Sequence, residues 1–249
     1  MFLTPQGEVR VIGHRGAAAL APENTLASFR KAAALGVQWV EMDVSLLADG
    51  GTVIFHDEVL DRCTNGHGLL AAQTMDTVVG LDAGSWFDPA YAGERIPDLR
   101  SALAVIQQAG MGLNLEIKHD GPGVEQLVDA VLATLATEWA DHDSLLISSF
   151  NHQALQRCHR WAPHYRRGQL YEQVPSQWAE ELAEIEAWSL HCNWRALDAA
   201  LTRRIKAAGY RLLCYTVNNP LDVAAHWAWG MDAIFTDDPR QFGFTESVK

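Results

Sequence analysis

The stretch VIGHRGAAALAPENTLASFRKAAALGVQWVEMDVS, residues 11–45, decides the fold, because it contains a strand, a helix and a second strand in succession. The first apolar run ends at Gly13, and the polar residues that follow interrupt it. Residues 24–36 then place apolar side chains three and four positions apart, as an amphipathic helix requires. Residues 39–45 alternate between apolar and polar, as a strand does. Such a unit predicts two parallel strands joined by a helix.

The same alternation recurs along almost the whole chain. Helical patterns separate short segments that predict strands, at residues 9–13, 39–45, 52–56, 112–118, 145–150, 167–171, 188–192, 211–217 and 233–236. Strands that alternate with helices indicate a parallel sheet. The chain has 249 residues, close to the roughly 250 of a typical (β/α)8 barrel. We therefore predict an α/β fold, a TIM-like (β/α)8 barrel, with residues 1–249 as a single domain.

Residues 58–96 interrupt this rhythm, after the second or third predicted strand. They show no convincing helical pattern, but they contain the turn signals TNGHG, DAGSWFDP and YAGER and the aromatic residues Trp86, Phe87 and Tyr91. A long irregular segment inside a domain is usually functional or disordered, and the aromatic residues favour an ordered flap. The alternative is an excursion that packs on its own side chains and has no function.

Composition and charge exclude several classes of protein. A formal net charge of −12 repels nucleic acid and anionic membrane surfaces, so an anionic ligand needs local cations or a metal. No apolar stretch approaches the roughly 20 residues that span a bilayer, and the opening MFLTPQGEVR does not have the pattern of a secretory signal. The four cysteines form no CxxC pair, which favours free thiols in a reducing compartment. We expect a cytoplasmic protein and predict no particular oligomeric state.

Carboxylates alternate with apolar side chains on two predicted strands. In WVEMDVS, Glu41 and Asp43 share one face, and in GLNLEIK Glu116 shares its face with Lys118. The inner face of a barrel turns polar only near its mouth, so these carboxylates should converge at the C-terminal end. Like charges this close need a proton or a cation, and an all-oxygen site suits Mg²⁺ or Ca²⁺. The alternative is a metal-free network in which Glu116 pairs with Lys118 and Asp43 caps a helix.

Two histidines, His14 and His56, end predicted strands, and a charged residue follows each of them. Strand alternation places His14 and Arg15 on opposite faces unless the turn re-aims one of them. Together with Arg15 and Lys118, the two histidines offer an acid, a base and anion-binding donors. The other histidines are expected to be core or surface residues without a chemical role: His67, His119, His142, His152, His159, His164, His191 and His226.

These motifs resemble the glycerophosphodiester phosphodiesterases of the phosphatidylinositol phospholipase C-like barrel superfamily, and in particular their cytoplasmic bacterial branch. The matching stretches run in family order from residue 9 to residue 240: GHRGAAALAPENTLASF, VEMDVSLLADGGTVIFHDEVLDRCTNG, LDAGSWF, GERIPDL, LNLEIK, YTVNNP and DAIFTDDP. The combination of the HRG…APENT opening with ExD, HD and EIK is highly specific, whereas HRG alone is not.

The resemblance implies a TIM-like barrel with a small insertion over its mouth, at about residues 58–96. It also implies a role for each motif residue: Glu41, Asp43 and Glu116 hold one divalent cation, Mg²⁺ or Ca²⁺, His14 and His56 are the general acid and base, and Arg15 and Lys118 bind phosphate. One departure is Tyr215, where many members have tryptophan, so a substrate contact made by that tryptophan is in doubt here.

The reaction that the resemblance implies is hydrolysis of a small-molecule glycerophosphodiester, such as glycerophosphocholine or glycerophosphoethanolamine, to sn-glycerol 3-phosphate and an alcohol. In the superfamily a glycerol hydroxyl attacks phosphorus and water opens the resulting cyclic phosphate, with His14 favoured as base and His56 as acid. Three alternatives are a lysophospholipase D-like activity, a TIM-barrel glycosidase that uses paired carboxylates, and a noncatalytic phosphate-binding barrel. A glycosidase needs no such His-Arg pair, and the net charge of −12 disfavours a basic lipid-binding surface.

Overall fold

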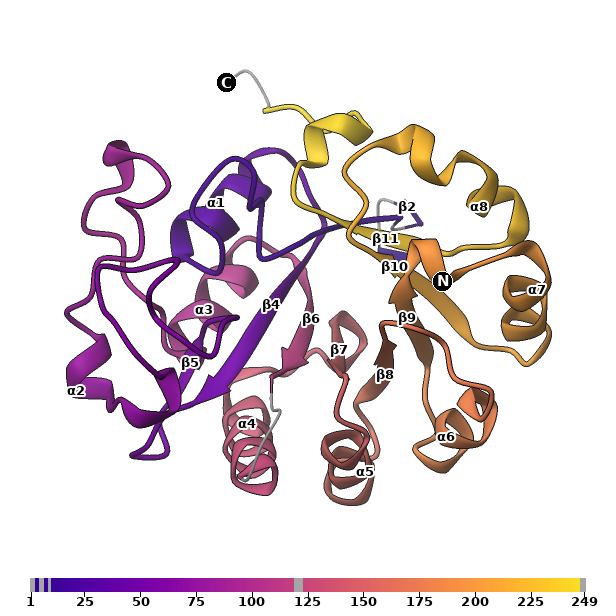
Figure 1. The fold of residues 1–249 in the computed structure, drawn as a ribbon, viewed down its shortest axis with the longest axis horizontal. Helices are drawn as coiled ribbons and strands as arrows, with labels where there is room; N and C mark the ends of the chain where they lie inside the picture. The colour runs from indigo at the N-terminus through magenta and orange to yellow at the C-terminus, as the bar shows by residue number, and fades with distance from the viewer. Residues whose placement is uncertain (1–2, 5–6, 9, 119–122, 247–249) are drawn as a thin grey trace.

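Eight parallel strands close into a ring in the computed structural model, which describes residues 3–4, 7–8, 10–118 and 123–246 (Figure 1). The strands are β3 (Val11–Gly13), β4 (Trp39–Leu46), β6 (Gly112–Ile117), β7 (Leu145–Ser149), β8 (Arg166–Tyr171), β9 (Ser189–Asn193), β10 (Arg211–Tyr215) and β11 (Ala233–Thr236). The ring closes because β3 pairs with β4 on one side and with β11 on the other. The predicted TIM-like barrel is confirmed. Val9, expected in the first strand, lies outside the described residues.

Helices surround the ring in Figure 1 and follow the helical patterns of the sequence. They are α1 (Leu26–Ala34), α3 (Leu99–Gln108), α4 (Val124–Glu138), α5 (His152–Trp161), α6 (Trp178–Glu184), α7 (Ala199–Ala207) and α8 (Ala224–Trp229). Four begin at a side chain that accepts a hydrogen bond from the backbone N–H three residues later: Thr25, Asp98, Asn151 and Asp198. Such N-caps satisfy donors that the first helical turn leaves free.

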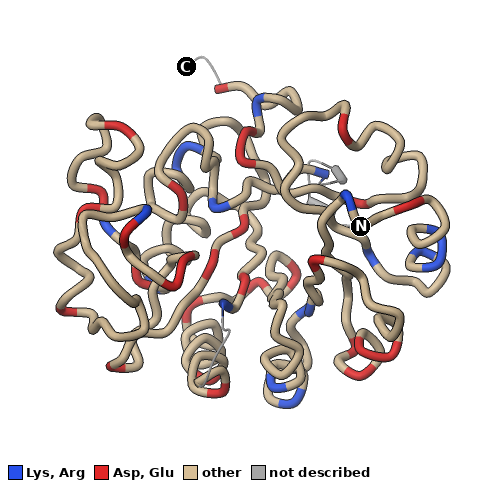
Figure 2. The backbone as a smooth tube through the Cα atoms, in the orientation of Figure 1, with Lys and Arg blue, Asp and Glu red and all other residues tan. Residues whose placement is uncertain are grey.

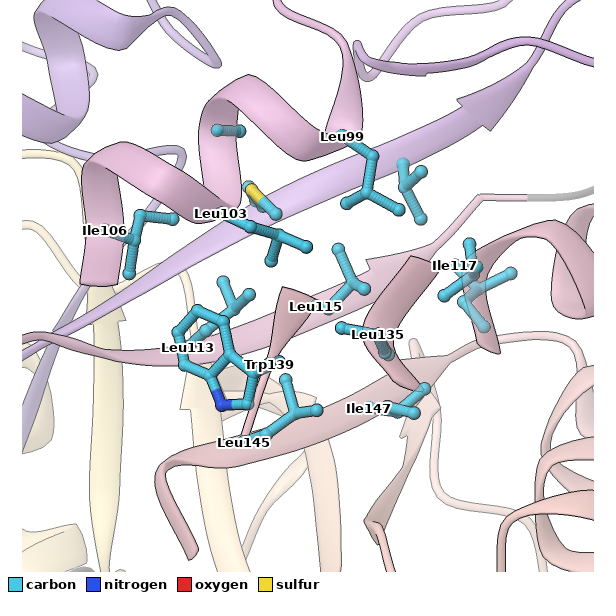
Figure 3. Packing of buried hydrophobic residues seen from close by; sticks show 14 of the residues in the cluster. Leu99, Leu103, Ile106, Leu113, Leu115, Ile117, Leu135, Trp139, Leu145 and Ile147 are labelled. Atoms are coloured by element: carbon cyan, nitrogen blue, oxygen red, sulfur yellow. The ribbon is translucent and has the colours of Figure 1, made fainter. Parts of the chain in front are cut away.

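The largest core lies between the strands and the helices outside them. In Figure 3, leucine and isoleucine side chains of β6 and β7 face those of α3 and α4, with Trp139 among them. Burying one such side chain contributes about 1.5–3 kcal/mol. A second, smaller cluster contains Ile12, Leu146, Leu213 and Phe235 from strands around the ring.

The predicted strand at residues 52–56 differs from the prediction. It is β5 (Thr52–Ile54), which runs antiparallel to β4 and stands outside the ring. A parallel neighbour needs a crossover of a dozen or more residues, but only residues 47–51 connect β4 to β5. These residues form a tight turn in which the N–H of Leu47 donates to the carbonyl of Gly51 at 2.9 Å. The connection therefore permits only a hairpin.

Residues 58–96 follow β5 and lie at the edge of the molecule in Figure 1, beside β5 and α1 rather than across the centre of the ring. They contain one short helix, which the sequence did not predict, and two 3₁₀ turns: α2 (Met75–Val78), η1 (Leu70–Ala72) and η2 (Pro89–Tyr91). The segment shares an apolar cluster with the β4–β5 hairpin, in which Leu60, Cys63 and Leu70 pack with Val53 and Phe55. The Tyr91 hydroxyl donates to the carbonyl of Leu20 at 3.1 Å, so an aromatic residue ties the segment to the barrel.

The remaining elements are short. They are the antiparallel pair β1 (Leu3–Thr4) and β2 (Gly7–Glu8), and the 3₁₀ turns η3 (His142–Ser144), η4 (Trp194–Ala196), η5 (Pro220–Val223) and η6 (Pro239–Phe242). All four cysteines are buried free thiols, as the sequence predicts. Within the described part of the chain, no helix has both the length and the apolar character needed to cross a membrane.

Candidate active site

A cavity of about 240 Å³ opens where the parallel strands end. Side chains from several strand ends line it: His14, Arg15, Glu41, His56, Asn114, Glu116, Lys118, Phe150, Leu170, Glu172, His191, Tyr215, Thr216 and Phe235. Six of the seven predicted site residues are among them, and the seventh, Asp43, lies beside Arg15. In Figure 2, acidic positions on β4 and β6 lie near the centre of the ring. No residue of 58–96 lines this cavity, but Glu58, Leu69, Leu70 and Ala71 line an adjoining cavity together with His56 and Lys118.

Three carboxylates meet at one point of this cavity. Asp43 on β4 stands in register with Glu116 on β6, and one oxygen from each of Glu41, Asp43 and Glu116 lies within 4.8 Å of the others. Burial raises the pKa of Glu41, and the charges of Asp43 and Glu116 raise it further. Burial and the charge of Asp43 raise the pKa of Glu116 to about 7. Carboxylates packed this closely are stable in their ionised form only with a cation beside them.

The donor set fits a hard divalent ion. Glu41 Oε1 is buried and has no hydrogen-bond partner among the described residues, which is the position expected of a metal ligand. Oxygen atoms from three carboxylates are the ligands that Mg²⁺ and Ca²⁺ prefer. An ion at this point would give Glu41 Oε1 the partner that it lacks.

The structure contains one of the two contacts expected for a metal-free network. Lys118 Nζ lies 2.9 Å from Glu116 Oε1 and 3.9 Å from Asp43 Oδ1, so the expected ion pair exists. Asp43 does not cap a helix: its Oδ2 accepts from Asn24 Nδ2 at 2.8 Å and lies 3.3 Å from Arg15 Nε. Burial works to raise the pKa of Asp43, but the charge of Arg15 leads a group of interactions that lower it. These contacts do not reach Glu41 Oε1, so the network does not account for all three carboxylates.

His14 follows β3 and is held by a carboxylate from the end of β11. Its Nδ1 donates to Asp237 Oδ1 at 2.6 Å, while Asp237 Oδ2 accepts from Asn218 Nδ2 at 2.6 Å. An ionised Asp237 can only accept, so Nδ1 carries a proton, and in the neutral form of the ring Nε2 is the atom with the free lone pair. Nε2 lies 3.9 Å from Glu41 Oε2 and therefore faces the carboxylates. Our reading of the sequence missed Asp237 and Asn218, although both stand in the motifs DAIFTDDP and YTVNNP.

His56 has a carboxylate partner next to it in the chain. Its Nδ1 lies 2.6 Å from Asp57 Oδ1, and its side chain is 31% exposed. Burial lowers the pKa of His56, although the charge of Asp43 opposes the change. The hairpin between β4 and β5 brings the histidine back beside β4, which explains how a residue outside the ring reaches the cavity.

The turn after β3 re-aims Arg15 into the cavity. Arg15 has a φ of 49°, in the left-handed region, which is uncommon for a residue with a side chain. Its N–H donates to Glu41 Oε2 at 2.9 Å, and its carbonyl accepts from Ser28 Oγ at 2.8 Å. Gly16 follows with a φ of 90°, and a Cβ there would lie 2.4 Å from Ser28 Oγ. His14 and Arg15 thus both face the site, and alternation alone would have separated them.

Two further residues that the sequence analysis singled out line the cavity. His191, expected to be a satisfied core residue, lies in the barrel, where its Nε2 is 2.8 Å from Ser189 Oγ and its Nδ1 has no partner among the described residues. Burial lowers its pKa to about 3, so the ring is neutral. Tyr215 packs against Phe150, with ring centroids 5.9 Å apart, and its hydroxyl donates to the carbonyl of Tyr171 at 2.8 Å. His119 lies outside the described residues.

Comparisons with known proteins identify similar sequences and folds. The model of the "Glycerophosphoryl diester phosphodiesterase family" matches residues 14–241. A glycerophosphodiester phosphodiesterase of Caldanaerobacter subterraneus subsp. tengcongensis is 38% identical over 92% of this chain and 94% of its own length. One of Bacillus subtilis is 31% identical over 97% of this chain and 87% of its own length.

Solved structures show the same similarity. An Oleispira antarctica phosphodiesterase in complex with the product sn-glycerol-3-phosphate superposes with a TM-score of 0.91 at 40% identity, covering 96% of this chain and 97% of that chain. A glycerophosphodiester phosphodiesterase from Agrobacterium tumefaciens superposes with a TM-score of 0.77 at 28% identity, covering 94% of this chain and 98% of that chain.

Proposed function

The chain belongs to the glycerophosphoryl diester phosphodiesterase family and is an enzyme of that activity, and we propose that it hydrolyses its substrate with one divalent cation and two histidines. The proposed substrates are small glycerophosphodiesters such as glycerophosphocholine and glycerophosphoethanolamine. The proposed products are sn-glycerol 3-phosphate and the free alcohol, in line with the product bound to the Oleispira antarctica phosphodiesterase.

One observation carries the proposal: a three-carboxylate cluster, two carboxylate-held histidines and two cationic side chains meet at one end of the barrel. A phosphodiester needs both charge neutralisation and proton transfer, and this arrangement supplies the residues for each. The proposed metal ligands are Glu41, Asp43 and Glu116. A bound Mg²⁺ or Ca²⁺ would supply Lewis-acid polarisation of the phosphoryl oxygens.

Arg15 and Lys118 are the proposed phosphate-binding residues. Both side chains are mostly buried, at 15% and 19% exposure, and both lie near Asp43. Burial works to lower the pKa of Lys118, but the charges of Glu116 and Asp43 outweigh it and raise the pKa. The lysine is therefore an ammonium ion that can donate to a phosphoryl oxygen.

The proposed reaction has two steps. In the first, His14 Nε2 takes the proton of a glycerol hydroxyl, that oxygen bonds to phosphorus, and the bond from phosphorus to the alcohol breaks. The leaving alcohol takes a proton from His56, whose lowered pKa makes its protonated form a stronger acid. In the second step water opens the cyclic phosphate and the histidines exchange roles. Asp237 stabilises the protonated His14 that forms in between.

The similarity to phosphodiesterases favours this reaction over sugar hydrolysis and over noncatalytic phosphate binding. A lysophospholipase D-like activity differs only in the acyl chain on the glycerol, so it is the alternative that a substrate panel has to test. The cytoplasmic location stays a prediction from the sequence.

The test is to measure release of glycerol 3-phosphate from glycerophosphocholine, before and after EDTA treatment and after adding back Mg²⁺ or Ca²⁺. Release that EDTA abolishes and a divalent ion restores is the expected result. Activity that survives EDTA would contradict the metal requirement. Faster turnover of lysophosphatidylcholine would favour the alternative, and no product with any divalent ion would overturn the proposed substrates.

A further inference from the structure

Arg62, on the irregular segment 58–96, binds two carboxylates at once. Its Nε and Nη2 donate to Asp57 at 2.6 Å and 2.9 Å. Its Nη1 and Nη2 donate to the two oxygens of Glu23 at 2.7 Å each. Such paired contacts match the planar geometry of a guanidinium and hold both acceptors in fixed directions.

Each of these carboxylates also holds a group of the active site. Asp57 Oδ1 lies 2.6 Å from His56 Nδ1, and Glu23 Oε1 accepts from Arg15 Nη1 at 2.6 Å. An unbroken chain of charge-assisted contacts thus runs from His56 through Asp57, Arg62 and Glu23 to Arg15. The chain links the proposed acid to a proposed phosphate-binding residue through a single guanidinium.

The two carboxylates depend on Arg62 for their charge balance. The Glu23 side chain is 12% exposed and the Asp57 side chain 20% exposed, so water screens neither charge fully. Burial alone would raise the pKa of Glu23, but its hydrogen bonds from Arg62 and the charge of Arg15 lower it. Without Arg62, Arg15 would be the only arginine that donates to Glu23. Glu23 would then compete with a phosphate for the N–H groups of Arg15.

The segment 58–96 holds Arg62 in place. Leu60 and Cys63, on either side of it, are buried in the apolar cluster of the segment at 2% and 4% exposure. The arginine side chain itself is 46% exposed and reaches from this cluster to the two carboxylates. The anchored backbone and the paired contacts together define one position for the guanidinium.

We propose that Arg62 is a positioning residue for catalysis, which sets His56 through Asp57 and Arg15 through Glu23, and that the segment 58–96 serves to hold it. This inference rests on the proposed function, because it assigns Arg62 to the same reaction. It gives the segment a role at the site although none of its residues lines the cavity.

The experiment compares Arg62→Ala and Arg62→Lys with the wild type in the glycerophosphocholine assay at saturating divalent ion. The matched control is Arg95→Ala, an exposed arginine of the same segment whose Nη1 donates to the carbonyl of Gly80 at 3.0 Å. We expect kcat of R62A to fall by about 10- to 100-fold, the usual effect of losing a group that orients an active-site residue. R62K stays impaired because an ammonium cannot hold two carboxylates in one plane.

Chemical rescue separates positioning from a general loss of structure. Guanidinium chloride, added below its denaturing concentration, should raise kcat of R62A and leave R95A unchanged. Wild-type kcat in R62A, or a loss in R62A that is no greater than in R95A, would overturn the inference. So would a folded R62A, with the melting temperature of R95A, that guanidinium does not rescue. If R62A does not fold, wild-type kcat in R62K overturns the inference. A wild-type chain that releases no glycerol 3-phosphate would instead contradict the proposed function.

Discussion

Metal affinity should fall steeply between pH 8 and pH 6, because the proposed metal ligands are carboxylates and protons compete for them. Burial and the charge of Asp43 raise the pKa of Glu116 to about 7 in the metal-free protein. The ionised fraction of such a group falls from about 0.9 at pH 8 to about 0.1 at pH 6, so the affinity falls about tenfold. The pKa of Glu41 is also raised, first by burial and then by its acidic neighbours, so it adds to the loss.

Isothermal titration of the EDTA-treated protein with Mg²⁺ or Ca²⁺ measures this effect directly. Titrations in buffers of different ionisation enthalpy give the protons released, which should approach one or more per ion near pH 6 and decrease toward pH 8. Glu94→Gln is the matched control, because burial also raises the pKa of Glu94, which lies in the segment 58–96 and not at the cavity. Equal metal affinity of the wild type at pH 6 and pH 8 would refute the reasoning. So would an E94Q variant whose metal affinity no longer depends on pH.

Three further predictions concern single side chains. His14→Ala and His56→Ala should each lower kcat at least about 100-fold with the fold intact, as loss of a positioned acid or base does; near-normal turnover in both, with wild-type circular dichroism, would contradict their roles. Asp237→Asn should lower kcat by about 10²–10⁴-fold, because an amide lacks the charge that stabilises protonated His14; steady-state kinetics with an unchanged kcat would contradict this. Gly112→Ala should destabilise the fold by about 1–3 kcal/mol, since a Cβ would lie 2.2 Å from the Trp39 ring; denaturant unfolding with a wild-type midpoint would contradict it.

The features that follow from local geometry could be predicted from the sequence. Side chains two apart on a strand share a face, so Glu41 and Asp43 had to point the same way, and the equivalent strand at Gly112–Ile117 carries Glu116. The barrel itself follows from the repeated alternation of strands and helices. In each case a short repeating pattern of apolar and polar residues determines which way the side chains or the elements face.

The features that depend on the closed ring could not be predicted in the same way. Asp237 lies 223 residues from His14 in the chain, and they meet only because β3 pairs with β11. Arg15 faces the site because its backbone has a φ of 49°, which no alternation pattern encodes. By contrast, the antiparallel direction of β5 could have been predicted from the sequence, because a connection of five residues is too short for a crossover between parallel strands.

The two histidines are held by different parts of the molecule, so the orientation of each depends on a different part of the structure. Asp237 and Asn218 orient His14 from the end of the ring, so closure of the barrel is enough to place it. Asp57 and Arg62 orient His56 from the hairpin and the segment 58–96, which pack on their own apolar cluster. A change at Arg62 therefore acts on His56 through Asp57 and on Arg15 through Glu23, and leaves the His14–Asp237 pair intact. Barrel closure thus orients one of the two histidines proposed for proton transfer, and Asp57 with Arg62 of the inserted segment orients the other.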